Sequence, residues 1–227
     1  MTTPAPQDAP PASPSRPWLV PAGLAVALVA LVAGLVLGRG TAGAGTPRMT
    51  DEVSIGFARD MGTHHAQAVR MSEVAHRRSP DPTLNYMAFD ILSTQQGQLG
   101  MMSGWLDLWE QSQSGTAEPM AWMGHSGPMP GLATETELRA LDTLAVPAME
   151  EQWLRLMVRH HRGAIAMSDA AATGADSPDV ALLARGISDA QQSEINALQA
   201  QLRARGLTPE PDEAAGTHGG GHSAVPG

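Results

Sequence analysis

Hydrophobic and polar residues follow a helical period through the middle of the chain. Between about residue 50 and residue 206, small and apolar residues recur every three or four positions, a spacing that places them on one face of a helix. Proline, glycine and cap residues interrupt this period at a few points. The pattern predicts four long helices, which run from near Thr50 to before Ser79-Pro80, from Asp81-Pro82 to about Ser112, from Pro147 to Gly174, and from Ser177-Pro178 to Gly206.

The predicted helices form an internal repeat. Residues 57–106 align with residues 153–202 without a gap, at an offset of 96, and 14 of the 50 aligned positions are identical. Each copy holds two helices with a short connection, which predicts an antiparallel hairpin. Because neither hairpin can bury its apolar face alone, the two are predicted to pack as an all-α, antiparallel four-helix bundle.

These boundaries predict how the chain is organised. The bundle covers residues 50–206, with repeat one at 50–113, an inter-repeat segment at 114–146 and repeat two at 147–206. A short helix is predicted to begin within the inter-repeat segment, since Thr134 and Glu137 form a capping box. The two ends of the chain, residues 1–17 and 207–227, are rich in proline, alanine and glycine, a composition typical of disordered segments.

A strongly apolar segment precedes the bundle. No residue from Pro17 to Gly38 is charged, and a helix of this length would span about 33 Å, enough to cross a bilayer core of roughly 30 Å. The sequence therefore predicts a transmembrane helix at 18–38 and a linker at 39–49. The charges that flank the segment do not decide its orientation, which has to be inferred from function. The alternative is a signal sequence cleaved near Ala42-Gly43-Ala44, followed by secretion of the mature chain.

Composition narrows the function classes. The chain has 23 acidic residues, 14 basic residues that are all arginine, a net charge of -9 and no cysteine. A net-negative chain without lysine is a poor candidate for binding nucleic acid. The absence of cysteine excludes a disulfide framework, a zinc–thiolate site, an iron–sulfur cluster and a cysteine nucleophile. Thirteen methionines and eight histidines remain to be explained.

Methionine and histidine share one face of the first helix in each repeat. Thioether sulfur prefers Cu(I), and imidazole suits copper in either oxidation state. The pattern predicts a soft-metal site, with Cu(I) the favoured ion, whose ligands are Met61, His64, His65, Met71, Met157, His160, His161 and Met167. Because an imidazole must be neutral to bind metal, the affinity is predicted to fall as the pH drops through about 6.5.

Two further groups of residues bear on this site. Glutamines on the partner helices either orient the imidazoles or satisfy them in a purely structural network, and these are Gln95, Gln96, Gln191 and Gln192. The inter-repeat segment holds a second candidate metal patch, whose alternative role is a lid that plugs the end of the bundle. This patch consists of Met120, Met123, His125 and Met129.

Catalysis is the least supported interpretation of the sequence. A di-iron bundle needs two Glu-x-x-His motifs and two further glutamates. Glu73 and His76 form one such motif, but Asp169 and Ala172 stand at the equivalent positions of the second repeat. No nucleophile elbow, phosphate loop or dinucleotide fingerprint occurs in the sequence either.

The chain resembles a known family over about residues 50–205. The motifs that carry the resemblance are Met61-x-x-His64-His65-x-x-Ala68-x-x-Met71 with its copy from Met157 to Met167, Gln95-x-x-Gln98-Leu99-x-x-Met102-x-x-Trp105-Leu106, and the loop Met129-Pro-Gly-Leu-Ala-Thr134. They are similar to the bacterial exported domain of unknown function 305, which is placed in the ferritin-like superfamily. The resemblance implies two helical hairpins, an extracytoplasmic location, no established catalysis and, from relatives, copper or silver handling.

This sequence departs from the family pattern at two positions. Gln98 stands where glutamate is usual, although Glu194 keeps that residue in the second copy, and Gln201 stands where Trp105 would repeat. The hairpins are therefore not expected to be equivalent sites.

The sequence thus predicts a membrane-anchored, extracytoplasmic protein that binds copper or silver without turnover, in metal homeostasis or resistance. Its partners would be the membrane, through residues 18–38, and the metal ion. The second hypothesis is a structural or partner-binding module whose histidines stabilise the bundle. The third is a ferritin-like metal redox enzyme.

Overall fold

The computed structural model describes residues 51–115, 117–124 and 127–211. This part of the chain is all-helical, and no β-strand occurs within it. None of its helices has the length and apolar character needed to cross a membrane. The predicted anchor at 18–38 and its flanking segments, 1–17 and 39–49, lie outside the described residues.

The first hairpin consists of α2 (Glu52–Arg78) and α3 (Pro82–Leu108). Aspartate begins both helices, because the carboxylates of Asp51 and Asp81 each accept two backbone N–H groups of the first turn. α2 ends at Ser79, which is extended (φ -76°, ψ 126°), since a residue that precedes proline avoids the helical conformation. Local sequence therefore sets the tight connection of this hairpin.

α3 is shorter than the sequence pattern indicates. It ends at Leu108 rather than near Ser112, because the chain turns at Glu110, whose φ is 57°. The N–H of Gln111 donates to the carbonyl of Leu106 at 2.8 Å and closes the end of the helix. The predicted end missed this turn because no glycine marks it.

The second hairpin consists of α5 (Val146–Gly174) and α6 (Pro178–Ala204). Proline lies in the first turn of both helices. α6 ends two residues before the predicted end at Gly206, a glycine with a left-handed φ of 71°. The inter-repeat segment contains a single 3-10 turn, η1 (Ala121–Met123), and the short helix α4 (Glu135–Thr143). The capping box predicted for α4 is present.

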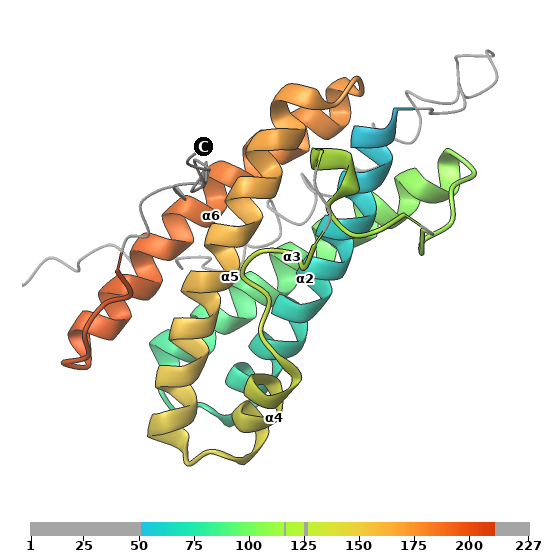
Figure 1. The fold of residues 1–227 in the computed structure, drawn as a ribbon. Helices are drawn as coiled ribbons and strands as arrows, with labels where there is room; N and C mark the ends of the chain where they lie inside the picture. Colours follow the sequence, from blue (N-terminus) through green and yellow to red (C-terminus); the bar gives the residue numbers. More distant parts are fainter. Residues whose placement is uncertain (1–50, 116, 125–126, 212–227) are drawn as a thin grey trace, which may run out of the picture. The chain divides into compact units, whose positions relative to one another are not determined.

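The two hairpins meet through their first helices. α2 packs against α3, α5 packs against α6, and α2 faces α5 with the opposite chain direction (Figure 1). η1 lies against α2, and α4 contacts both α2 and α5. The repeated Met–His helices therefore form the centre of the structure, and the inter-repeat segment crosses over them.

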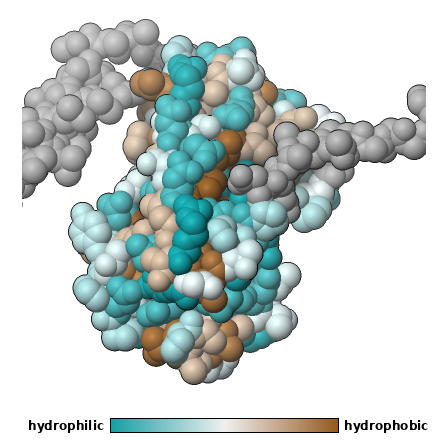
Figure 2. Space-filling model, turned by 90° about the vertical axis from the view of Figure 1, so that its left-hand side faces the viewer, coloured by the Kyte–Doolittle hydropathy of each residue, from teal (hydrophilic) through white to brown (hydrophobic). Residues whose placement is uncertain are grey.

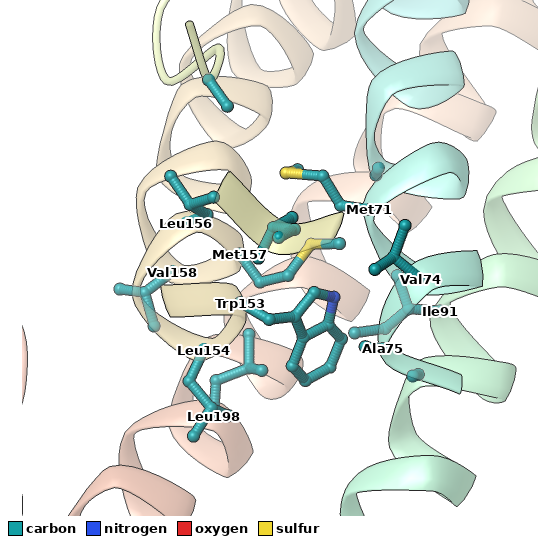
Figure 3. Packing of buried hydrophobic residues seen from close by; sticks show 14 of the residues in the cluster. Met71, Val74, Ala75, Ile91, Trp153, Leu154, Leu156, Met157, Val158 and Leu198 are labelled. Carbon is teal, nitrogen blue, oxygen red and sulfur yellow. The ribbon is translucent and has the colours of Figure 1, made fainter. Parts of the chain in front are cut away.

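Two apolar clusters fill the interior. The first, the Trp153 cluster, combines residues of α5 and α2 such as Trp153, Leu154, Met71 and Val74 (Figure 3). The second, the Met61 cluster, consists of Phe57, Ala58, Met61, Met102, Leu106, Trp109, Met120, Ala164, Met167, Ala171, Val180, Ala184 and Ile187. Burying a large apolar side chain contributes about 1.5–3 kcal/mol. On the face in Figure 2, hydrophobic residues form separate patches among hydrophilic ones, as amphipathic helices with inward apolar faces require.

The first five residues of the segment predicted to be a disordered tail, 207–211, lie within the described structure and make defined contacts. The side chain of Gln199 pairs with both backbone groups of Glu210, at 2.7 and 2.9 Å. The carboxylate of Glu210 lies 2.5 Å from the guanidinium of Arg155, and this contact raises the pKa of Arg155. Residues 207–211 are therefore held against the second hairpin by contacts that composition alone does not reveal.

Candidate metal centre

The four predicted histidines lie together where α2 meets α5. His64, His65, His160 and His161 are all 0% exposed, and the ring centroids of His64 and His160 are 3.7 Å apart. In α2, residues of the Met61 cluster come before the His64-His65 pair and residues of the Trp153 cluster come after it. In α5, the Trp153 cluster comes before the His160-His161 pair and the Met61 cluster comes after it. The imidazoles thus form a polar layer between two apolar clusters.

The central pair, His64 and His160, binds backbone carbonyls. Nε2 of His64 donates to the carbonyl of Pro130 at 3.0 Å, and Nε2 of His160 donates to the carbonyl of His64 at 3.0 Å. Since a carbonyl oxygen can only accept a hydrogen bond, both Nε2 atoms carry the proton. In the neutral ring, Nδ1 then keeps an unshared electron pair.

The outer pair binds side chains within each hairpin. Nε2 of His65 donates to Oε1 of Gln98 at 2.8 Å, and Nε2 of His161 donates to Oε2 of Glu194 at 2.7 Å. Both contacts join residues 33 positions apart, so they are equivalent in the two repeats. The geometry is repeated, but the second hairpin provides a carboxylate where the first provides an amide.

Burial keeps the imidazoles of His64, His65 and His160 neutral. It lowers the pKa of His64 to about 4 and that of His65 to about 3. It also lowers the pKa of His160 well below the ordinary value, and the neighbouring histidines add to this shift. The expectation that metal affinity falls through pH 6.5 used the pKa of an exposed histidine. At His64, protons compete with a metal only near pH 4.

The second nitrogen of each ring has no partner. The Nδ1 atoms of all four histidines are buried without a hydrogen bond in the described structure, and an unsatisfied buried polar atom costs about 1–3 kcal/mol. A neutral imidazole with a free Nδ1 is the form that binds metal. Within the described residues, however, no three His, Asp or Glu side chains are grouped so that they could hold an ion. A site with three or more protein ligands at this layer would therefore have to include methionine sulfur.

The predicted methionine ligands divide into two pairs. Met61 and Met167 belong to the Met61 cluster, and Met71 and Met157 belong to the Trp153 cluster. Each pair takes one residue from α2 and one from α5, and Figure 3 shows the side chains of Met71 and Met157 beside Trp153. All four are fully buried. The eight predicted ligands therefore do not form one shell, because the methionine pairs lie on opposite sides of the histidine layer.

The second predicted patch joins one of these pairs. Met120 is a buried member of the Met61 cluster, and the half-buried Met123 and Met129 pack against it. His125 lies outside the described residues. The side of the histidine layer that contains Met61 is therefore rich in thioether sulfur from both the helices and the inter-repeat segment.

Close backbone contact holds the inter-repeat segment over the histidines. A Cβ atom at Gly163 would lie 2.0 Å from the carbonyl oxygen of Pro130, so only glycine lets the loop reach α5 here. Gln67 fixes the next turn of the loop, since its side chain accepts the N–H of Ala133 at 2.6 Å and donates to its carbonyl at 3.0 Å. These contacts place the Pro130 carbonyl at His64.

The glutamines predicted to support the imidazoles are not their hydrogen-bond partners in the described structure. Gln96 and Gln192 are exposed, so they are on the wrong face of their helices for that role. Gln95 and Gln191 are buried, but their amide groups have no hydrogen-bond partner in the described structure. The imidazole partners are Gln98 and Glu194, described above. The signal that could have found them is that both stand three residues after Gln95 and Gln191, one helical turn further along the buried face.

The residues considered for a di-iron site do not face the histidine layer. Glu73 is exposed. His76 donates from Nδ1 to the carbonyl of Asn85 at 3.2 Å, within the first hairpin. This motif therefore gives no support to oxidase chemistry.

Comparison with known proteins identifies relatives of the chain. The family model for the domain of unknown function DUF305 matches residues 54–202. A DUF305 protein from Streptomyces coelicolor is 40% identical, with a TM-score of 0.69, and the match covers 72% of this chain and 99% of that protein. A DUF305 fragment from Deinococcus radiodurans is 34% identical, with a TM-score of 0.60 and coverages of 67% and 97%. No curated protein matches the chain.

A more distant structural neighbour is CopM. Its Cu(I)-bound form is 24% identical to this chain, with a TM-score of 0.52, and the match covers 67% of this chain and 96% of CopM. CopM is also known with Cu(II), with silver and in the apo form. A likeness at this identity shows a shared fold alone.

Proposed function

The chain belongs to the DUF305 family, and on that premise we propose that it binds soft metal ions, above all Cu(I), through buried histidine and methionine side chains. The observation that carries the proposal is the set of four buried Nδ1 atoms without partners. The Nε2 atoms are fixed by protein acceptors, so each ring is already oriented. A metal bond to Nδ1 would offset the cost of leaving that nitrogen unsatisfied.

The choice of a soft ion follows from the kinds of ligand atom near the central imidazoles. No carboxylate contacts the central imidazoles His64 and His160 through the bonds described above, and the layer is enclosed by clusters that contain methionine. Thioether and imidazole together suit Cu(I) and its analogue Ag(I) better than hard ions. The copper and silver forms of CopM support this choice at the level of the fold.

We further propose that the metal is cargo or is held in reserve, and is not used for turnover. No motif of an enzyme occurs in the sequence, and Glu73, the acid of the one di-iron motif, is exposed. This proposal covers metal homeostasis or resistance. It also keeps residues 50–206 as the metal-binding domain.

The location we propose is extracytoplasmic, with residues 18–38 as the membrane anchor and residues 1–17 in the cytoplasm. The uncharged run from Pro17 to Gly38 supports an anchor or a signal sequence. Methionine and histidine ligands, unlike thiolates, are compatible with an oxidising compartment. The Streptomyces relative, which is classed by inference as a secreted protein, agrees with export.

The second candidate function is a structural or partner-binding module. It is favoured by the lack of a grouped set of three His, Asp or Glu side chains in the described part of the chain. In that case the free Nδ1 atoms and the free amides of Gln95 and Gln191 would be satisfied by buried water.

Metal titration separates these candidates. The full-length protein, kept in mild detergent, is titrated with Cu(I) under anaerobic conditions against a competing chelator, and with Ag(I). We expect the tight site to be lost in the variant with His64→Gln and His160→Gln, which retains polar side chains of similar length. The exchange His76→Gln, outside the histidine layer, serves as the matched control and should leave binding intact.

A direct measurement on the ring completes the test. The 15N signals of the Nδ1 atoms of His64 and His160 should shift on addition of Ag(I), whereas the Nε2 signals keep the protonated form. Binding that is unchanged in the double glutamine variant would refute the assignment. Elemental analysis that finds iron in the protein as purified would favour the redox alternative.

A further inference from the structure

A groove leads from solvent to the methionine-rich side of the histidine layer. It lies between the first half of α2 and the inter-repeat segment and encloses about 500 Å³. Its walls include Ile55, Asp60 and Thr63 of α2, with Trp122 and Met129 of the inter-repeat segment. This Met129 groove has no role in the function proposed above, which concerns only the buried interior.

Met129 joins the groove to the interior. Its half-buried side chain lines the groove and also packs against the Met61 cluster. The next residue, Pro130, provides the carbonyl that accepts the hydrogen bond of His64. The fully buried histidines have no solvent contact of their own. An ion that enters past Met129 would therefore arrive beside the residue that holds His64.

The charges around the groove favour a cation. The lining contains the carboxylates of Glu52, Asp60 and Glu118 and one guanidinium, that of Arg59. An excess of negative charge in a concave surface raises the local concentration of cations. The groove therefore combines an attractive field at its mouth with a thioether ligand in its wall.

A defined set of contacts holds the outer wall in place. The same oxygen of Asp60 accepts the backbone N–H of Met120 and the indole N–H of Trp122, both at 2.8 Å. The indole ring lies over Gly56, where a Cβ atom would come within 2.5 Å of Trp122. The carboxylate of Asp60 and the space above Gly56 thus fix the position of the outer wall on α2.

We propose that the Met129 groove is an entry site for soft metal ions, at which the thioether of Met129 binds the ion before it passes to the histidine layer. This inference rests on the proposed function for the destination of the ion. It adds a surface site of its own, with Ag(I) or Cu(I) as the ligand.

Stopped-flow mixing of the full-length protein with Ag(I) tests the entry site. Tryptophan fluorescence is recorded because Trp122 lies in the groove wall. A fast phase from the groove should precede a slower phase that depends on the histidines. Met129→Leu, which removes the sulfur but keeps the volume, should slow the second phase about tenfold, the loss that corresponds to about 1.4 kcal/mol. The total Ag(I) bound per protein should fall only by the entry site itself.

Matched variants make the outcome specific. Met101→Leu removes a sulfur from a side chain that is 48% exposed on α3 and does not line the groove, and it should leave both phases unchanged. Trp122→Phe should abolish the fast fluorescence change. Gly56→Ala should displace Trp122 and accelerate uptake. A second phase of wild-type rate in Met129→Leu would overturn the entry site.

Failure of this inference and failure of the proposed function look different. If only the entry site is wrong, the variant with His64→Gln and His160→Gln loses tight binding while Met129→Leu behaves as wild type. If only the histidine site is wrong, the fast phase remains and is removed by Met129→Leu, but the double glutamine variant binds metal as wild type does.

Discussion

Gln67 in α2 and Gly163 in α5 occupy equivalent positions of the two repeats, yet they meet the inter-repeat segment in different ways. Gln67 binds both backbone groups of Ala133, whereas Gly163 has no side chain and leaves room for the carbonyl of Pro130. One repeat thus fastens the loop while the other accommodates it. The segment between the repeats therefore breaks the symmetry of the duplicated fold.

The hydrogen bonds of the histidines also differ between the two repeats. His160 donates to the backbone of the opposite hairpin, at the carbonyl of His64, but His64 donates to the loop at Pro130. The outer histidines differ in their hydrogen-bond partners, which are the amide of Gln98 at His65 and the carboxylate of Glu194 at His161. The two repeats therefore share their helix geometry but not the surroundings of their imidazoles.

The largest expected effect comes from acid, which acts on two members of the histidine layer, His64 and His65. The pKa values of His64 and His65 are about 4 and about 3 in the folded protein, against about 6.5 in the unfolded chain. Between these values the unfolded chain binds more protons, so stability is complete above pH 6.5 and decreases as the pH falls towards 4. We expect urea unfolding to show a loss of several kcal/mol across this window.

A variant of one repeat sharpens this measurement. His65→Gln removes one of the two groups, so its free energy of unfolding should depend less steeply on pH than that of the wild type. Equal slopes for the variant and the wild type would contradict the pKa assignment at His65. The comparison needs only the relative slopes, so a change in stability at pH 7 does not affect it.

Gly163→Ala removes the space that the second repeat leaves for the loop, and we expect it to have the next largest effect. The new Cβ atom would meet the backbone oxygen of Pro130 at 2.0 Å, and backbone has little freedom to move away. We expect a loss of about 3 kcal/mol in the free energy of unfolding. Gly186→Ala in α6 is the matched control, because no atom lies within 4 Å of its added Cβ. The control should gain about 0.5–1 kcal/mol.

Gln67→Leu removes the other contact with the loop. It leaves both backbone groups of Ala133 without their partners, for which we expect a loss of about 2 kcal/mol. Amide hydrogen exchange at Ala133 should become faster. Gln192→Ala, at an exposed position, is the control and should change stability by less than about 0.5 kcal/mol. Unchanged exchange at Ala133 in Gln67→Leu would show that Gln67 does not hold the loop through Ala133.

The smallest effect is expected when the outer histidine pairs are made alike. Glu194→Gln replaces a charged acceptor by the amide that the first repeat uses, and it should cost about 1 kcal/mol or less. The reciprocal exchange, Gln98→Glu, should raise the pKa of His65, because a carboxylate favours the protonated ring. NMR titration of the ring checks this, and an unchanged value would show that Gln98 is not the partner in solution.

The helices and their pairing were predictable because their causes are local. The cap residues Asp51, Asp81 and Ser177 lie next to the helices they begin, and the capping box of Thr134 lies within one turn. The offset of 96 likewise revealed that the histidines recur on equivalent helices. Contacts between distant residues were not predictable in this way, as at residues 207–211, which Arg155 and Gln199 hold in place.

By itself, the sequence determined two hairpins of helices and one face on which histidine and methionine recur, since both depend on periodicity and caps. Only the tertiary structure decided the surroundings of those side chains. It separated the methionines into two clusters, gave the imidazoles Gln98 and Glu194 as partners, and brought Pro130 to His64 across 66 residues. Such contacts depend on the docking of one hairpin on the other and on a loop that fits beside a glycine, which no local pattern encodes.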